Sequence, residues 1–238
     1  MKKFVMIQIV LSALLYAEGP KPTQHKAWSD NFSGGKLSNK WMASNGGLGF
    51  SPKHVDLSQK MLGLKLVQTK NEKGEFTSLG AEVQTREVYG FGTYTWEMRA
   101  SSTATTPLGV GVGQSGSSSG IFNFIDDSAV EIDFEIEGSR SHLVWAVNWY
   151  KPKWDVKGVR VNADQEFHTY KYIWTSQKIE YFIDEKLVWT VTDHVPQKPA
   201  FVIMNHWGTK SVKWGGLPTE GTRHMWIKRF SFEPRVEK

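Results

Sequence analysis

Short segments in which apolar and polar residues alternate follow one another along much of this chain. Alternation with a period of two residues is typical of β-strands, whose successive side chains point to opposite faces of a sheet. No amphipathic pattern long enough for a helix of three turns is present. We therefore expect an all-β fold, a sandwich or jelly roll of antiparallel strands. The clearest segments are 62–69, 92–99, 142–150, 169–175, 179–183 and 225–232.

Turn residues separate these segments. Glycines predict turns at 45–47, 73–74 and 215–216, and Asp184-Glu185 between two apolar runs predicts a hairpin. Residues 109–120 are rich in glycine and serine. Because strand patterns continue on both sides of this stretch, we expect a mobile loop inside one domain rather than a linker between two.

The N-terminus has the layout of a secretory signal peptide, predicted at residues 1–17. Lys2 and Lys3 precede the apolar run 4–16, and polar sequence follows. The run is short for a membrane-spanning helix, although an uncleaved anchor remains the alternative. We expect a single mature domain at 18–238, secreted or periplasmic and with no membrane attachment after cleavage.

Composition narrows the classes of partner. The net charge is +5, but the lysines and arginines are scattered, with no block of five or six like charges. A solvated surface is therefore expected rather than nucleic-acid binding, and we expect a monomer. The chain has no cysteine, and a domain of this size does not need disulfides. Its 11 tryptophans exceed the needs of a core, and flat aromatic rings are suited to stacking on sugars.

The most informative segment is 130–137, Val-Glu-Ile-Asp-Phe-Glu-Ile-Glu. Alternation places Ile132, Phe134 and Ile136 on one face, which we expect to join the core. The other face carries four carboxylates that repel one another, and acidic residues are poor strand formers. Such an arrangement indicates a function that uses it. The four acidic residues are Glu131, Asp133, Glu135 and Glu137.

Glycoside hydrolysis uses a pair of carboxyl groups on either side of the scissile bond. In retaining enzymes the two groups lie roughly 5–5.5 Å apart. Glu131 and Glu135 would be about 13 Å apart at Cα on a flat strand. Their side chains must therefore lean toward each other, as a concave sheet would allow. Asp133 between them would raise the pKa of a neighbour and orient the other.

Two other interpretations of the acidic segment remain open. It can be an exposed acidic edge strand, or it can bind a cation. Three carboxylates suit Ca²⁺, but such sites usually come from a turning loop rather than a straight strand. The seven histidines are dispersed, and no pair has metal-ligand spacing with a third ligand nearby, so we predict no metal site.

The segment Glu-Ile-Asp-Phe-Glu resembles the active-site signature of glycoside hydrolase family 16. The resemblance extends from about Trp28 to Phe232, because four other segments resemble motifs of that family in the same order. The family includes lichenases, laminarinases and xyloglucan transferases. The four segments are Tyr89–Arg99, Phe167–Trp174, Ile179–Asp184 and Met204–Trp207.

This resemblance implies a concanavalin A-like jelly roll of two antiparallel sheets with a concave sugar-binding cleft, and a family 16 catalytic domain at 18–238. It also implies retention of anomeric configuration. Glu131 would be the nucleophile, Asp133 its partner and Glu135 the acid/base. The regular spacing of the motif is the form typical of lichenases and xyloglucan transferases.

The resemblance also implies sugar-binding positions on other strands. Trp207 would be a platform on which a sugar ring stacks; the alternative is that it packs in the core. Glu82 would contact the sugar; the alternative is that it is an exposed strand residue without that role. Trp149 is expected to point into the sandwich. The implied sugar-binding residues are Glu82, Gln84, Asn148, Tyr150, Asn205 and Trp207.

The chain departs from the pattern in three places. Val130 stands where related members usually carry Asp, Glu137 stands where an apolar residue is usual, and glycine and serine replace an aromatic-rich segment before the motif. Some members bind a structural Ca²⁺, but no matching Asp lies around 225–227, so no cofactor is expected.

Three functions follow as hypotheses. The first is an endo-acting β-glucanase on 1,3-1,4 or 1,3 linkages. The second is a transglycosylase, which uses the same carboxylates but passes the sugar to another sugar. The third is a non-catalytic carbohydrate-binding module. The intact pair Glu131 and Glu135 argues against the third, since a binding module does not need it.

Overall fold

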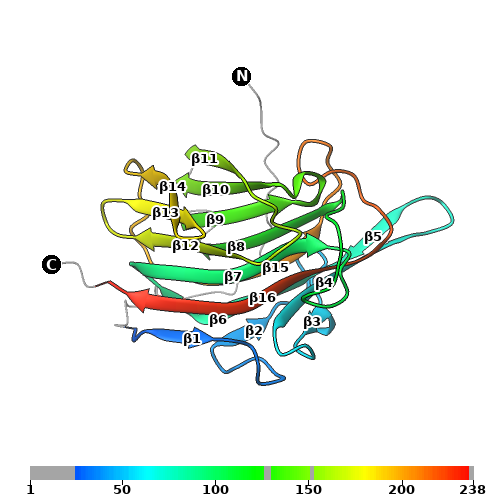
Figure 1. Ribbon diagram of the computed structural model, residues 1–238, viewed down its shortest axis with the longest axis horizontal. Coiled ribbons are helices and arrows are strands. Elements are labelled where there is room, and N and C mark those ends of the chain that lie inside the picture. Colours follow the sequence, from blue (N-terminus) through cyan, green and yellow to red (C-terminus); the bar gives the residue numbers. More distant parts are fainter. Residues whose placement is uncertain (1–24, 126–129, 151–152, 236–238) are drawn as a thin grey trace.

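The computed structural model describes residues 25–125, 130–150 and 153–235 (Figure 1). The predicted signal peptide lies outside these residues. The described chain forms a jelly-roll sandwich of two antiparallel sheets, which confirms the predicted fold class. The only helical elements in the described ranges are two single 3₁₀ turns, η1 (Pro52–His54) and η2 (Gly138–Arg140).

The larger sheet has nine strands in its described part. Its main order is β14-β13-β12-β7-β16-β4-β3, while β1 pairs with β16 and β5 pairs with β4. Its strands are β1 (Trp28–Asp30), β3 (Val55–Asp56), β4 (Leu62–Lys70), β5 (Phe76–Leu79), β7 (Gly92–Ser102), β12 (His168–Trp174), β13 (Ile179–Ile183), β14 (Lys186–Val191) and β16 (Gly221–Pro234).

The other sheet has seven described strands, in the order β11-β10-β9-β8-β15-β6-β2. The acidic segment forms β9, which has two strands on one side and four on the other. The strands are β2 (Trp41–Ala43), β6 (Ala81–Tyr89), β8 (Ser117–Ile125), β9 (Val130–Glu137), β10 (Leu143–Tyr150), β11 (Lys153–Arg160) and β15 (Ala200–Gly208).

The core lies between the two sheets and is rich in aromatic rings. The three apolar residues of β9 are buried in it, as expected from their alternation. The Phe134 ring lies 5.4 Å from the rings of both Tyr170 and Tyr181 on the opposite sheet. Burying this face fixes the register of β9, because a slip of one residue would exchange its two faces. The carboxylates are thereby held on the side away from the core.

The predicted hairpin at Asp184-Glu185 joins β13 to β14. Both residues have positive φ, 48° and 62°. This conformation matches the two-residue turns whose twist suits adjacent antiparallel strands. The hairpin prediction is confirmed.

The predicted loop at 109–120 is partly wrong, because its last four residues begin β8. The three serines at its start are fully buried. Ser119 Oγ accepts a hydrogen bond from the Ser101 amide, at 3.0 Å, and the Ser117 and Ser101 hydroxyls lie 3.1 Å apart. Ser117 and Ser119 thus contact Ser101 of β7 through their hydroxyls, which explains a buried strand start without apolar residues.

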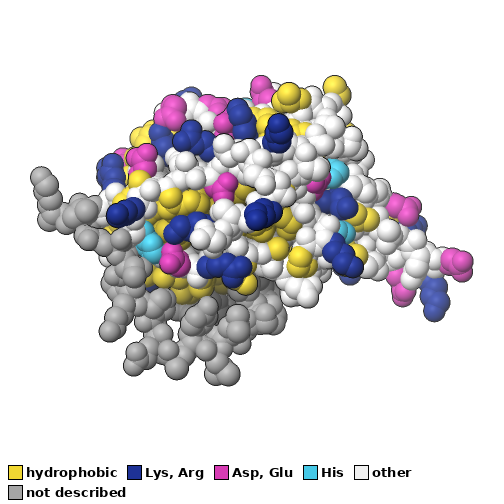
Figure 2. Space-filling model, turned by 90° about the horizontal axis from the view of Figure 1, so that it is seen from below, with side chains coloured by type: hydrophobic (Ala, Val, Ile, Leu, Met, Phe, Trp, Pro, Cys, Tyr) yellow, Lys and Arg dark blue, Asp and Glu magenta, His cyan; other side chains and the backbone are white. Residues whose placement is uncertain are grey.

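Charged side chains of both signs are interspersed on the face shown in Figure 2. Lys and Arg lie among Asp, Glu and exposed apolar groups on that face. Within the described ranges, no helix combines the length and the apolar character needed to cross a bilayer.

Candidate active site

Glu131, Asp133 and Glu135 project from β9 on the side opposite the core; we call this side of the seven-stranded sheet the carboxylate face. Glu131 is 8% exposed and Asp133 only 1%, whereas Glu135 is half-buried. All three are therefore largely withdrawn from water. Removing a carboxylate from water disfavours its charged form.

The strands beside β9 explain this burial. Residues directly opposite one another in an antiparallel pair share a face. Four of the six residues opposite the three acids on β8 and β10 are aromatic. The opposite residues are Phe124 and Trp149 for Glu131, Phe122 and Val147 for Asp133, and Gly120 and Trp145 for Glu135.

Burial and the charges of neighbouring carboxylates shift Asp133 and Glu135 toward their protonated forms. Burial raises the pKa of Glu135 to about 8, and the charges of Glu131 and Glu137 add to the effect. The pKa of Asp133 is raised well above its usual value, first by burial and then by Glu131 and Glu135. Neither side-chain oxygen of Asp133 has a hydrogen-bond partner within the described structure. The strand therefore favours carboxylic acids at Asp133 and Glu135.

Glu137, at the end of β9, is held by three donors. Its Oε1 accepts from Trp145 Nε1 at 2.8 Å and from Arg140 Nη2, and its Oε2 accepts from the Gly215 amide at 2.7 Å. The Arg140 guanidinium also lies over the Trp145 ring, 5.4 Å from its centroid. Glu137 thus joins β9, β10 and the 209–220 segment around the Glu135 end of the site.

A second polar group lies on the carboxylate face beyond β8. Asn205 on β15 is opposite Glu82 on β6, and its Nδ2 donates to Glu82 Oε2 at 3.2 Å. Ser44 Oγ donates to the other carboxylate oxygen at 2.8 Å. Burial nevertheless raises the pKa of Glu82. Asn205 Oδ1 has no partner in the described structure and is free to accept a hydrogen bond.

Gly120 links this polar group to the acids. It lies opposite Glu135 on one side and Asn205 on the other. A side chain at this position would meet Asn205 Oδ1, which lies 2.8 Å from an ideal Cβ. The glycine therefore leaves the space between Glu135 and Asn205 unfilled by a side chain.

Four of the six predicted sugar-binding residues lie on the carboxylate face. Gln84 is opposite Ile203, which shares a face with Asn205, and its amide contacts Met42 Sδ at 3.6 Å. Trp207 lies two residues after Asn205 and is buried. The four residues are Glu82, Gln84, Asn205 and Trp207.

The placement of Asn148 and Tyr150 on this face is wrong. Asn148 is opposite core-facing Ile132, and its Nδ2 donates to the His194 carbonyl at 3.3 Å. The Tyr150 ring stacks on the His194 ring, with centroids 5.2 Å apart. Trp149, expected to point inward, is instead opposite Glu131.

Sequence reasoning therefore missed several aromatic residues of the site. Phe122 and Phe124 pack with Ile203 and Phe201 in a small apolar cluster on the carboxylate face. The signal that identifies them is their alternation within 117–125, which places both on one face of β8. The missed ring-bearing residues opposite the acids are Phe122, Phe124, Trp145 and Trp149.

A metal-binding arrangement does not appear in the part of the chain that the structure describes. No three His, Asp or Glu side chains within 25–125, 130–150 and 153–235 converge to hold an ion. The three acids follow one another along a strand.

Comparison with known proteins identifies the family. The family model of "Glycosyl hydrolases family 16" matches residues 43–227. The chain belongs to glycosyl hydrolase family 16. The matched residues include the acids of β9 and the polar group formed by Glu82 and Asn205.

Relatives with described activities cover much of this chain. It is 28% identical over 191 residues to the "Endo-1,3-1,4-beta-glycanase ExoK" of Rhizobium meliloti, covering 74% of this chain and 64% of that protein. It is 27% identical over 152 residues to a "Beta-glucanase" of Acetivibrio thermocellus, covering 60% of this chain and 42% of that protein. The chain thus spans less than two thirds of the length of both relatives.

A solved structure shows the same fold. The β-glucanase of Bacillus licheniformis superposes with a TM-score of 0.75 and 20% sequence identity. The superposition covers 90% of this chain and 100% of that one. The sandwich described above is therefore a fold shared with a β-glucanase.

Proposed function

We propose that this family 16 protein is an exported, endo-acting, retaining β-glucanase that cleaves 1,3-1,4 or 1,3 linkages as a monomer. The observation that carries the proposal is that Glu131 and Glu135 lie on the same face of β9 and that the pKa of Glu135 is raised to about 8. A retaining glycosidase needs one carboxylate to attack and one carboxylic acid to donate a proton. The family match and the names of the relatives support the choice of substrate.

In the first step, the Glu131 carboxylate attacks the anomeric carbon and the bond to the leaving oxygen breaks. Glu135 donates its proton to that oxygen, which leaves as a hydroxyl of the departing sugar chain. The product is a covalent glycosyl-enzyme at Glu131. The negative charges of Glu131 and Glu137 support the proton on Glu135. Asp133, lying between the two glutamates as a carboxylic acid, would orient Glu131 by donating a hydrogen bond to it.

In the second step, Glu135 acts as a base. It removes a proton from water, whose oxygen attacks the anomeric carbon and displaces Glu131. Glu135 then again carries its proton and Glu131 its charge. Two displacements at the same carbon retain the anomeric configuration.

The polar group beside the acids would hold the sugar. The unpartnered Asn205 Oδ1 would accept a hydrogen bond from a sugar hydroxyl. Glu82 orients Asn205 by accepting its amide hydrogen. Trp207 would offer an apolar surface from the same strand, and Gln84 a further amide.

The direct test is incubation of purified protein with a panel of β-glucans, followed by mass analysis of the products. We expect internal cleavage of a 1,3-1,4 or 1,3 glucan into oligosaccharides. Products longer than an oligosaccharide substrate would assign transglycosylation instead. Binding of glucan without cleavage of any member of the panel would favour the binding-module hypothesis.

The rate should have a bell-shaped pH dependence. Activity falls at low pH when the attacking carboxylate takes up a proton, and at high pH when Glu135 loses its own. Because the pKa of Glu135 is raised to about 8, we expect the descending limb of kcat/KM near pH 8. The pKa values read from the two limbs describe the coupled set of acids rather than one residue.

A substitution at Glu137 tests the origin of that limb. Glu137→Gln removes a negative charge that raises the pKa of Glu135. The descending limb should move to lower pH, measured as kcat/KM against pH. Circular dichroism checks the fold, since Glu137 accepts hydrogen bonds from three donors. A descending limb that stays in place or moves upward would contradict the electrostatic role.

A further inference from the structure

The carboxylate face continues past β10 onto the edge strand β11. The register places three residues of β11 on this face, opposite Trp149, Val147 and Trp145 of β10. These β10 residues are themselves opposite the three acids of β9. One uninterrupted face therefore runs from the acids to the edge of the sheet. Its β11 residues are Trp154, Val156 and Gly158.

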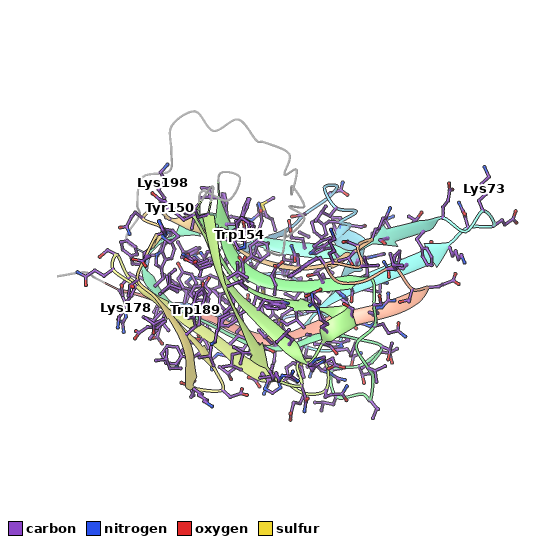
Figure 3. The ribbon with its side chains drawn as sticks, turned by 90° about the horizontal axis from the view of Figure 1, so that it is seen from above. Lys73, Tyr150, Trp154, Lys178, Trp189 and Lys198 are labelled. Carbon is purple, nitrogen blue, oxygen red and sulfur yellow. The ribbon has the colours of Figure 1, made fainter. Side chains whose placement is uncertain are left out.

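Two tryptophans form the outer end of this face. The Trp149 and Trp154 rings have centroids 5.0 Å apart and planes inclined by 34°. Trp154 is labelled in Figure 3. Trp154 is 41% exposed, and the adjacent Val156 is 40% exposed. We call Trp154 and Val156 the apolar strip. Contiguous exposed apolar surface rimmed by polar residues is typical of ligand-binding grooves and interaction sites.

The strip lies on the opposite side of β9 from Glu82 and Asn205. The sheet order is β11-β10-β9-β8-β15-β6, so the acids stand between the two groups. Neighbouring strands are about 4.8 Å apart, which puts β11 about 10 Å from the acids. A polysaccharide that crosses β9 reaches both groups, as an endo-acting enzyme requires of its substrate.

We propose that Trp154, supported by Trp149, forms a stacking platform for a glucosyl unit of a β-glucan beyond the catalytic strand, on the side away from Glu82. The proposal rests on the proposed function and extends it to chain-length selectivity. The CH-bearing face of a pyranose is flat and apolar, and it matches an exposed indole in shape and polarity.

The chemistry of β11 favours a sugar over a second protein chain. Its opposite face carries Lys153, Asp155 and Lys157. Charged residues on an edge strand oppose pairing with a strand of another molecule. A neutral polysaccharide that approaches along the carboxylate face does not meet these charges.

The test is calorimetric titration of Glu131→Gln protein with mixed-linkage β-glucan oligosaccharides of increasing length. Trp154→Ala in that background should weaken binding of the longer oligosaccharides roughly tenfold, since about 60 Å² of apolar contact corresponds to about one decade in Kd. Binding of oligosaccharides too short to reach β11 should not change. Trp154→Phe, which keeps an aromatic face, should restore most of the affinity.

Lys157→Ala is the matched control, because it changes the other face of the same strand. It should leave every affinity unchanged, and thermal unfolding should show that each variant is folded. Equal affinities of the Trp154→Ala and parent proteins for the whole series would overturn the platform, while wild-type cleavage of glucan would still support the proposed function. Reversible dimerisation that Trp154→Ala abolishes, with unchanged sugar affinities, would assign the strip to self-association. Absence of both cleavage and binding would overturn the two proposals together.

Discussion

Glu131→Gln should lower turnover of a β-glucan by about four orders of magnitude or more while leaving oligosaccharide binding intact. The amide keeps the shape of the side chain between Phe124 and Trp149 but has no negative charge with which to attack. Catalysis through a covalent glycosyl-enzyme depends on that attack. Binding depends mainly on other groups of the carboxylate face and should persist.

Initial rates on the cleaved glucan, together with calorimetric binding, measure this effect. Glu97→Gln is a suitable control, since Glu97 lies on β7 of the other sheet and pairs with Lys228 on the surface. It should retain wild-type turnover. If Glu131→Gln kept even a tenth of the wild-type rate, Glu131 would not be the nucleophile.

Glu135→Ala should produce a different defect. Turnover of natural glucan should fall by about 10²–10⁴-fold, because its leaving oxygen needs a proton. The first step on an aryl glycoside with a good leaving group should survive. Azide needs no base, so it should intercept the glycosyl-enzyme and give a β-glycosyl azide. With Glu131→Ala, azide would replace the nucleophile and give an α-glycosyl azide.

The configuration of each azide, read by nuclear magnetic resonance, separates the two roles. An α product from the Glu135 variant would reverse the assignment of nucleophile and acid/base. Failure of azide to restore turnover in either variant would argue against the covalent mechanism on β9.

Much of the fold could be predicted because alternation directly reports burial on one face of a strand. Segments such as 62–69 and 179–183 became β4 and β13, and the acidic segment became β9 with its apolar side in the core. Resemblance to family motifs supplied the jelly-roll architecture and the polar positions on β6 and β15. Both kinds of signal depend on residues near one another in sequence.

The error at Asn148 and Tyr150 has a physical origin. Which residues of β10 share a face with the acids depends on how many residues separate β10 from β9. The connection includes the 3₁₀ turn η2, and one residue more or less would exchange the two faces of the following strand. The spacing of family motifs does not determine how many residues the connection contains. The backbone pairing of Trp149 with Glu131 in the structure does, and it shows which residues of β10 share a face with the acids.

The buried acids also make folding a proton-uptake reaction. Glu135 has an ordinary pKa of 4.5 when exposed and about 8 in the fold, and the pKa values of Asp133 and Glu82 are raised as well. Between these limits the folded chain holds protons that the unfolded chain releases. The contribution of Glu135 to stability is therefore full below about pH 4.5 and is lost as pH rises toward 8.

Urea unfolding at about pH 5 and about pH 8 should show this loss, and Glu135→Gln, which has no proton to exchange, should reduce the difference. Equal unfolding free energies at the two pH values would contradict the linkage. The same burial that keeps a proton ready for the leaving group thus makes the native state weaker in mildly alkaline surroundings than in mildly acidic ones.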